Sequence, residues 1–435
     1  MRLPARLDWE TQSTPLNVLC ISWGTTGNLS PVLTAARQLN RAGHQPRVMA
    51  DPAMRGEVEA AGFPFIGWRR APTGSDADPA DFSDLADWLR QTMFAPAGAY
   101  AADTLDEIRR LPTDAVLSLD LLPGCALAAE AASLPHAVLS PHISIRPLPG
   151  MPPAASGLTP PRTAEERAVV DAATDAIVSA MEQGRPALNA ARRAFGLPPV
   201  ASAFAHFDRA DRVLLAVSRT FDFDTEALPA NYRYIGPLLD APGWSRGALT
   251  TWPGARRPRI LVAGSTGAQN QTDLLRRVAR ALGAIEAETV LTTGPHVGAE
   301  ELAAPDSIRV VAAASHDALM AEADLVVCQG GHGTVSRALL HGAPLLVIPL
   351  ARDQTDNAAR IAVRGAGLRL PAGASEAEIA AAARRILAEP GFRTAAEALG
   401  AAVRADLDAN GLVREIEAMT AAHRGAARGG DRLWA

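Results

Sequence analysis

The chain has 435 residues, of which 48% are hydrophobic and 20% charged, with a net charge of −5. This length exceeds one usual domain and favours two. The acidic balance leaves no broad basic surface for a phosphate backbone, which excludes nucleic acid as an expected partner. Because the sequence has neither a signal-peptide core nor an apolar run long enough to cross a membrane, we expect a cytoplasmic protein, monomeric or homodimeric, that acts away from membranes.

The first half of the chain alternates short apolar runs with Ala-rich helical stretches. The predicted strands are 16–22, 45–50, 114–120, 136–140 and 212–218. The predicted helices are 31–43, 52–62, 124–133 and one or two within 164–195. This βα rhythm indicates a doubly wound parallel sheet covered by helices on both faces.

Two Pro- and Gly-rich segments interrupt this rhythm. The first, 141–161, precedes the long helical stretch and is typical of a lid or an acceptor wall. The second, 231–258, breaks the periodicity altogether. We therefore predict an N-terminal domain over 14–237 and an interdomain linker over 238–257.

The βα rhythm then restarts. The predicted strands are 259–265, 288–294, 308–312, 323–329 and 344–350. The predicted helices are 271–286, 333–341, 375–388 and 393–424. A second doubly wound domain is therefore expected over 258–411, and the remaining helix and tail, 412–435, can cross back to the first domain. Three widely spaced cysteines inside apolar runs predict core packing, with neither a disulfide nor a metal site.

The most informative segment is 323–367, where a buried strand ends in a glycine-rich turn. Gly330, Gly331 and Gly333 let the backbone approach an anion closely, and Thr334 stands where a helix opens. Unpaired N–H groups and the positive end of a helix dipole both favour a diphosphate. The turn therefore predicts a phosphate site.

A second motif follows the next strand, where Asp353 and Gln354 begin another helix. Both strands deliver these residues at their carboxyl ends, where open α/β sheets bind ligands. Asp and Gln together can accept from and donate to neighbouring sugar hydroxyls. Taken singly, each motif is more often a structural turn or a helix start, but together they indicate a nucleotide-sugar site.

This combination resembles the donor-binding segment of the glycosyltransferases that include plant UDP-glycosyltransferases and bacterial antibiotic glycosyltransferases of the macrolide type. Segments 24–50 and 233–237 extend the resemblance over most of the chain. It implies an α/β protein of the GT-B fold, in which two Rossmann-like domains face each other across a cleft. It also implies an inverting, metal-independent transfer of a sugar from a dTDP-linked deoxysugar, or a UDP-sugar, to a small hydrophobic natural-product aglycone. The nucleotide sugar would be a co-substrate, with no cofactor.

The resemblance also assigns donor-site roles. Ser265 and Thr266 would face the donor phosphates, and the main chain at Ala314 would contact the base, although the aromatic residue common in that loop is absent. Gln329 stands where a His often precedes the glycine pair. His332 can contribute a phosphate contact, or it can be an exposed residue at a helix start. The full predicted donor set is Ser265, Thr266, Ala314, Gln329, Gly330, Gly331, His332, Gly333, Thr334, Asp353 and Gln354.

The acceptor half departs from the family pattern. Much of the family has a catalytic His in the first βα loop, and Thr26 stands at that position here. Thr26 is not a general base at neutral pH. Either the base comes from elsewhere, with Asp120 and His142, which follow strands, as the other catalytic candidates, or the acceptor is one that needs little base catalysis, such as an amine, an acidic phenol or a carbon nucleophile. The predicted acceptor contacts are Asn28, Trp88, Met93 and Phe94, together with the loop 141–163.

Three other interpretations remain open. A degenerate homologue that supports a partner enzyme is the main alternative, because Thr26 replaces the base. A dinucleotide-dependent oxidoreductase would use Asp51 as a ribose-binding acid, but the first loop lacks the GxGxxG pattern. A metal-dependent transferase would need a DxD motif; 76–78 and 222–224 fit that pattern but are interpreted as solvated loops.

Overall fold

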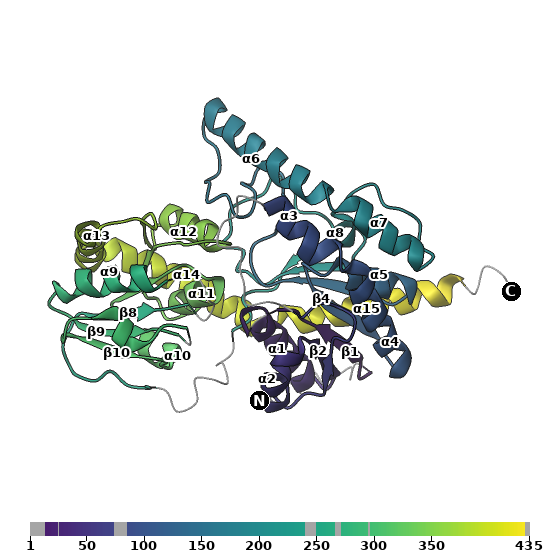
Figure 1. The fold of residues 1–435 in the computed structure, drawn as a ribbon, viewed down its shortest axis with the longest axis horizontal. Helices are drawn as coiled ribbons and strands as arrows, with labels where there is room; N and C mark the ends of the chain where they lie inside the picture. Colours follow the sequence, from purple (N-terminus) through teal and green to yellow (C-terminus); the bar gives the residue numbers. More distant parts are fainter. Residues whose placement is uncertain are drawn as a thin grey trace, which may run out of the picture.

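A computed structural model describes residues 14–24, 26–73, 85–239, 249–265, 271–294 and 296–430 of the chain. At residues 26, 85–86 and 426–430 only the main chain is described. The described residues form two lobes, each built around a parallel sheet (Figure 1). No helix in this part of the chain is both long and apolar enough to cross a membrane.

The first sheet has seven described strands, all parallel, in the order β3-β2-β1-β4-β5-β6-β7. The strands are β1 (Asn17–Ile21), β2 (Gln45–Ala50), β3 (Phe65–Gly67), β4 (Ala115–Leu119), β5 (His136–Ser140), β6 (Arg212–Leu215) and β7 (Tyr232–Tyr234). The order reverses between β1 and β4, which opens a crevice at their carboxyl ends. β7 lies in a stretch predicted to be irregular, so the sheet extends further than expected.

Helices cover both faces of this sheet. They are α1 (Thr26–Arg41), the 3-10 turn η1 (Pro52–Met54), α2 (Arg55–Ala60), α3 (Leu85–Leu89), the π-helical turn η3 (Arg90–Phe94), α4 (Ala97–Arg110), α5 (Pro123–Ala131), α6 (Ala164–Glu182), α7 (Arg185–Ala194) and α8 (Ala205–Asp208). A capping box between Thr163 and Glu166 begins α6. Helix α4 was not predicted, because polar and small residues obscure its apolar face.

The second sheet has six described parallel strands in the order β10-β9-β8-β11-β12-β13. The strands are β8 (Arg259–Ala263), β9 (Glu288–Thr292), β10 (Ile308–Val311), β11 (Leu325–Cys328), β12 (Leu345–Val347) and β13 (Gly367–Arg369). The helical elements are α9 (Thr272–Gly283), η5 (Ala299–Leu302), α10 (His316–Met320), α11 (His332–Leu340), α12 (Gln354–Val363), α13 (Glu376–Ala388), α14 (Pro390–Asp408) and α15 (Gly411–Gly430). β8 and β11 meet at the second reversal of strand order.

The last predicted helix, 393–424, is in fact two helices. Asn410 adopts a left-handed conformation with φ of 49° between α14 and α15. Asn tolerates this region better than most residues, and Gly411 follows it. The break turns α15 back along the N-terminal lobe, where Leu412 and Ile416 join its hydrophobic core (Figure 1).

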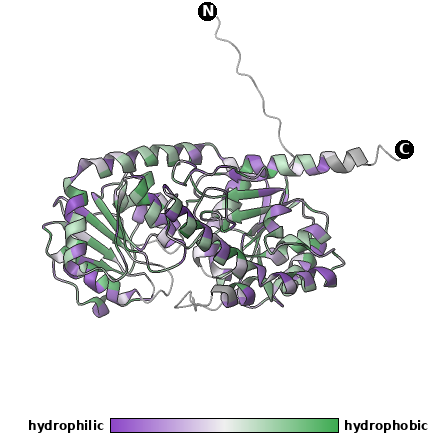
Figure 2. Ribbon diagram, turned by 90° about the horizontal axis from the view of Figure 1, so that it is seen from above, coloured by the Kyte–Doolittle hydropathy of each residue, from purple (hydrophilic) through white to green (hydrophobic). Residues whose placement is uncertain are grey.

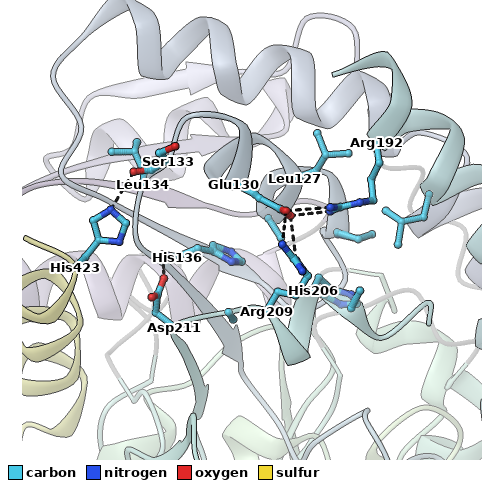
Figure 3. Close-up of a pocket in the computed structure, with 15 residues that line it drawn as sticks. Leu127, Glu130, Ser133, Leu134, His136, Arg192, His206, Arg209, Asp211 and His423 are labelled. Carbon is cyan, nitrogen blue, oxygen red and sulfur yellow. Dashed lines mark hydrogen bonds and ion pairs between the residues drawn. The ribbon is translucent and has the colours of Figure 1, made fainter. Parts of the chain in front are cut away.

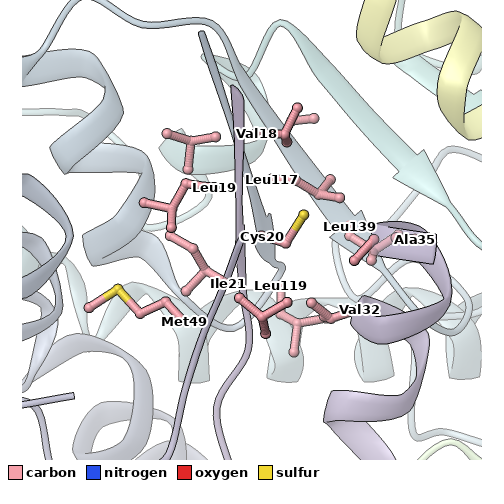
Figure 4. Close-up of a cluster of buried hydrophobic side chains, with 14 of the residues drawn as sticks. Val18, Leu19, Cys20, Ile21, Val32, Ala35, Met49, Leu117, Leu119 and Leu139 are labelled. Carbon is pink, nitrogen blue, oxygen red and sulfur yellow. The ribbon is translucent and has the colours of Figure 1, made fainter. Parts of the chain in front are cut away.

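Apolar strands lie at the centre of both lobes (Figure 2). In the N-terminal core, β1 contributes Val18, Leu19, Cys20 and Ile21, and α1 packs onto them through residues that include Val32 (Figure 4). All three cysteines are buried and unpaired, which confirms their predicted core role.

A buried ion pair joins the lobes. Arg360 of α12 donates from Nε and Nη2 to Asp222 Oδ1, at 2.8 and 2.7 Å, and the two side chains are 2% and 0% exposed. Tyr234 donates its hydroxyl to the other carboxylate oxygen of Asp222 at 2.8 Å. The Phe223 ring lies 4.2 Å from the Arg360 guanidinium. The expectation that 222–224 is a solvated loop is therefore wrong for Asp222, because Arg360 compensates its charge inside the protein.

Replacing Arg360 with Met should lower the free energy of unfolding by about 3–5 kcal/mol, because it leaves the Asp222 carboxylate buried without its cation. Urea denaturation followed by tryptophan fluorescence measures the change. Arg385→Met, which removes an exposed pair with Glu389, is the control and should leave the midpoint unchanged. Equal midpoints for the two variants would contradict the stabilising role of the interdomain pair.

Candidate functional site

The glycine-rich turn predicted to bind phosphate lies between β11 and α11. Gly330 has φ of +99°, and a Cβ there would lie 2.6 Å from Val347 Cγ1, so this position requires glycine. A Cβ at Gly331 or Gly333 would meet nothing within 4 Å. The turn therefore presents its backbone to open space.

Helix α11 begins at His332, two residues before the predicted Thr334, and Gly331 is its N-cap. No side chain caps this end of the helix. The helix dipole and the N–H groups of His332 and Gly333 can therefore serve an anion, whereas the Thr334 N–H donates to Gly331 O at 3.0 Å.

Asn357 connects the two predicted donor motifs, and the sequence analysis did not single it out. Its Nδ2 donates to Gly330 O at 2.9 Å and to Asp353 Oδ2 at 2.8 Å. The i,i+4 spacing from Asp353 on one helix was the available signal. The structure thus brings Asp353 to the edge of the glycine-rich turn.

Gln354, which was predicted to contact the sugar, bonds to the backbone of its own loop. Its Oε1 accepts from the backbone N–H groups of Leu350 and Ala351, at 2.8 and 3.1 Å. These bonds shape the turn between β12 and α12. The amide oxygen is therefore already engaged, whereas the half-buried Asp353 stands at the N-cap of α12.

His332 is only 8% exposed, so the interpretation as a water-facing residue is wrong. Its Nε2 donates to the carbonyl oxygen of Ala216, just beyond β6, at 3.1 Å. Burial lowers the pKa of His332, which favours the neutral ring. This nitrogen is thus committed to the N-terminal domain, since a carbonyl oxygen can only accept.

Gln329 links the glycine-rich turn to the end of β8. Its Nε2 donates to Gln271 Oε1 at 2.7 Å, and Gln271 Oε1 also accepts from the backbone N–H of Ser265 at 2.7 Å. Gln271 was not predicted, because a single Gln at a helix start carries little signal. Thr266 lies outside the described residues.

The predicted base-binding loop contacts the predicted linker at Leu249. Ala314 is buried and forms an isolated parallel bridge with Leu249, in which Ser315 N–H donates to Leu249 O at 2.8 Å. His316 lies 3.2 Å from Thr292 Oγ1, and burial lowers its pKa to about 4.

On the N-terminal side, the structure brings together two of the three catalytic candidates. Asp120 follows β4, His142 follows β5, and their Oδ2 and Nε2 atoms lie 3.6 Å apart. Ser140 donates to the same Asp120 oxygen at 2.8 Å. The His142 Nδ1–H donates to Ile143 O at 2.8 Å, which leaves Nε2 as the basic nitrogen of the neutral ring.

Burial and neighbouring charges act differently on the two members of this pair. It raises the pKa of Asp120, which is 2% exposed. Burial alone would lower the pKa of His142, but the charges of Asp120, Asp353 and Asp356 outweigh it and raise that pKa. Because Asp353 and Asp356 belong to the C-terminal domain, charges of both domains act on His142.

The structure places the other residues predicted on the acceptor side differently from one another. Thr26 begins α1, and its side chain lies outside the described residues. Asn28 is half-buried, and its Nδ2 lies 3.1 Å from the position of a Cβ on Gly24. Trp88 packs at a tilt against Trp23, with ring centroids 6.4 Å apart, beside the first βα loop. Trp23 was not predicted, although an aromatic residue after the first strand was visible in the sequence.

The prediction that Met93 and Phe94 contact the acceptor is wrong. Both are 0% exposed and belong to a hydrophobic cluster beneath α6 and α7. A Cβ on Gly184 would lie 1.9 Å from the Phe94 ring, so this ring fills the space between helices. Apolar residues in an unfamiliar stretch were core residues, as they more often are.

The residues of the alternative interpretations have structural roles where they are described. Asp51 caps η1 by accepting from Ala53 N–H at 3.1 Å. The 76–78 segment lies outside the described residues, and Asp224 is exposed and paired with Arg219. Within the described part of the chain, no three His, Cys, Asp or Glu side chains cluster as metal ligands.

A separate hollow of about 310 Å³ lies near the amino end of β5 (Figure 3). Its central charge, Glu130, accepts hydrogen bonds from both Arg192 and Arg209. These groups satisfy one another, and the hollow is at the sheet end opposite His142. It has no evident part in the site.

Residues 276–419 match the domain family described as the erythromycin biosynthesis protein CIII-like C-terminal domain. The chain is 28% identical over 396 residues to 4'-demethylrebeccamycin synthase of Lentzea aerocolonigenes, covering 86% of this chain and 92% of that protein. It is 33% identical over 215 residues to the TDP-daunosamine transferase DnrS of Streptomyces peucetius, covering 46% and 47% respectively.

Solved structures show the same fold. The kitacinnamycin glycosyltransferase has a TM-score of 0.74 at 22% identity, covering 94% of this chain and 99% of that one. The glycosyltransferase VinC, solved in complex with dTDP, has a TM-score of 0.66 at 20% identity, covering 92% and 100%. The predicted arrangement of two Rossmann-like domains is confirmed.

Replacing Gly331 with Val should abolish measurable binding of dTDP, because the side chain would project into the open space before α11. The backbone at Gly331, with φ of −58° and ψ of 137°, accommodates Val without strain. Isothermal titration calorimetry measures the affinity. Gly391→Val, at another position where a Cβ meets nothing within 4 Å, is the control; unchanged dTDP affinity in the Gly331 variant would remove the phosphate assignment.

Proposed function

We propose a specific reaction for this chain, a glycosyltransferase of the GT-B fold. It transfers the sugar of a dTDP-linked deoxysugar, or of a UDP-sugar, to a small hydrophobic natural-product aglycone. The transfer inverts the anomeric carbon and requires no metal ion or resident cofactor. The names of the TDP-daunosamine transferase and of the VinC complex with dTDP support the choice of donor. We place the reaction in the cytoplasm, where the nucleotide sugar is consumed as a co-substrate.

One contact between the domains carries this proposal: Asp356, three residues after Asp353 on α12, accepts hydrogen bonds from Ala155 and Gly157 of the loop that begins beside His142. The charge of Asp353 also contributes to raising the pKa of His142, which agrees with this placement. A sugar held at Asp353 would therefore lie close to a basic nitrogen of the opposite domain. Such juxtaposition of donor and base is what glycosyl transfer requires.

On the donor side, the diphosphate lies against the start of α11. Gly331 and Gly333 offer backbone N–H groups, and the helix dipole offsets the charge that develops on the leaving diphosphate. Asp353 accepts from hydroxyls of the sugar, and Asn357 orients Asp353 by donating to it.

On the acceptor side, His142 is the general base. Its Nε2 takes the proton of the acceptor hydroxyl while that oxygen bonds to the anomeric carbon from the face opposite the diphosphate. The bond between that carbon and the phosphate oxygen breaks, so configuration inverts. The resulting imidazolium is stabilised by Asp120, 3.6 Å away. Trp23 and Trp88 offer an aromatic wall to the aglycone.

Turnover tests this function directly. Purified chain, supplied with dTDP- and UDP-sugars and a panel of phenolic, polyketide and indole aglycones, should form one glycoside per sugar consumed. Mass spectrometry identifies the product, and NMR coupling constants should show inverted anomeric configuration with EDTA present. Binding of nucleotide sugar without consumption, in a chain on which a partner enzyme's activity depends, would instead identify a degenerate helper.

His142→Gln should lower kcat by about 10²- to 10⁴-fold, the usual contribution of a general base. The wild-type rate should fall as the pH drops through the raised pKa of His142, above about 6.5, because only the neutral ring accepts a proton. This acidic limb should vanish in the variant.

His423→Gln is the matched control, since His423 lies on α15 and its Nε2 bonds to Ser133 O at 3.0 Å, at the sheet end opposite His142. Its profile should match that of the wild type. If His142→Gln keeps both its rate and its acidic limb, another group activates the acceptor.

Asp353→Ala should raise the donor KM or lower kcat while dTDP affinity changes less than about threefold, since Asp353 contacts the sugar rather than the diphosphate. Steady-state kinetics and calorimetry with dTDP provide the two measurements. A parallel loss of dTDP affinity would place Asp353 in the diphosphate site instead.

A further inference from the structure

Asp356, on the first turn of α12, binds a loop of the opposite domain. Its Oδ2 accepts from Ala155 N–H at 2.6 Å, and its Oδ1 accepts from Gly157 N–H at 2.8 Å. Asp356 is 2% exposed. Both carboxylate oxygens are therefore used across the cleft, between residues about 200 positions apart in the chain.

The loop is shaped for this contact. Ala155 and Gly157 both adopt positive φ angles, 63° and 61°, so that their N–H groups converge on one carboxylate. Within the loop, Ser156 donates its hydroxyl to Pro153 O at 2.7 Å. Arg369 adds a hydrogen bond from Nη1 to Gly157 O at 2.8 Å. A strained, non-glycine conformation at Ala155 persists only where the surroundings hold it.

The position of this contact relates it to both halves of the site. Asp356 lies three residues after Asp353 on the helix that carries the donor motif. The bound loop belongs to the segment 141–163, which begins beside His142. The contact therefore spans from the predicted acceptor wall to the donor helix.

Because the Asp356 carboxylate is buried, its hydrogen bonds to the loop do not by themselves stabilise the fold. Burial raises the pKa of Asp356 to about 6, against the opposing effects of the Gly157 and Ala155 N–H groups and of Arg360. A buried carboxylate is costly even when it is hydrogen-bonded. The distinctive property of Asp356 is thus the geometry that it imposes on the loop.

We propose that Asp356 is a positioning residue that fixes residues 151–158 as one wall of the acceptor site against the donor helix. This inference rests on the proposed glycosyl transfer. With the wall fixed, the aglycone hydroxyl meets the anomeric carbon and water is kept out. Without it, diphosphate binding persists but water competes with the aglycone for the sugar.

The test compares Asp356→Asn, Asp356→Ala and Gly157→Ala with the wild-type chain. Gly157→Ala disturbs the same contact from the loop side, because its Cβ would lie 2.9 Å from Thr355 Cβ at a positive φ. Asp175→Asn, at an exposed acid of α6, is the matched control. Hydrogen exchange of the peptide covering 151–158 reports the contact without any substrate.

We expect this peptide to exchange faster than in the wild type in all three variants, and at the wild-type rate in the control. Transfer, as kcat/KM for the aglycone, should fall about 10- to 100-fold, as for a misplaced reactant. Affinity for dTDP should stay within about twofold, and the ratio of donor hydrolysis to transfer should rise.

Two results would overturn the inference: unchanged exchange in the variants, or transfer, hydrolysis and dTDP affinity falling together. The exchange measurement is independent of turnover. A chain that transfers no sugar but shows faster exchange in the variants would therefore refute the proposed reaction while leaving the loop contact in place.

Discussion

The structure depends on the buried contact between Arg360 and Asp222, because it makes α12 a component of both domains. The helix follows a strand of the C-terminal sheet, yet its guanidinium is compensated by a carboxylate of the N-terminal domain. The packing agrees. Ala359 of α12 joins the N-terminal cluster, and Phe221 joins the C-terminal one. An element shared in this way helps to fix the distance between the two sheets, together with α15, which packs on the N-terminal core.

This shared helix explains how separate motifs become one site. Asp353 stands at its N-cap, Asn357 ties that residue to the glycine-rich turn, and Asp356 holds the acceptor-side loop. These side chains occupy one and a half turns, so a rotation of α12 would move all of them together. Donor and acceptor geometry are thus coupled through the backbone of one helix, with its far end anchored at Arg360.

The sequence predicted the fold and the position of the glycine-rich turn well, since strand and helix periods are local signals and the glycines mark a backbone constraint. It predicted long-range side-chain pairing poorly. Nothing local reveals that Asp222 and Arg360 meet, or that His332 bonds to Ala216. Met93 and Phe94 failed for the opposite reason: hydrophobic residues suit an acceptor pocket and a core equally, and only burial separates them.

The proposed catalytic pair, Asp120 and His142, also depends on long-range placement. β4 lies between β1 and β5, so its end, at Asp120, is flanked by the loops that follow both neighbours. The family pattern implies a His after β1, where this chain has Thr26. His142 follows β5 and reaches the same carboxylate from the other side. In a parallel sheet the carboxyl ends of adjacent strands are equivalent neighbours, so an acid on the central strand can pair with a base from either one. For the proposed reaction the requirement is a base beside Asp120, and the sheet order allows that base to follow either neighbouring strand.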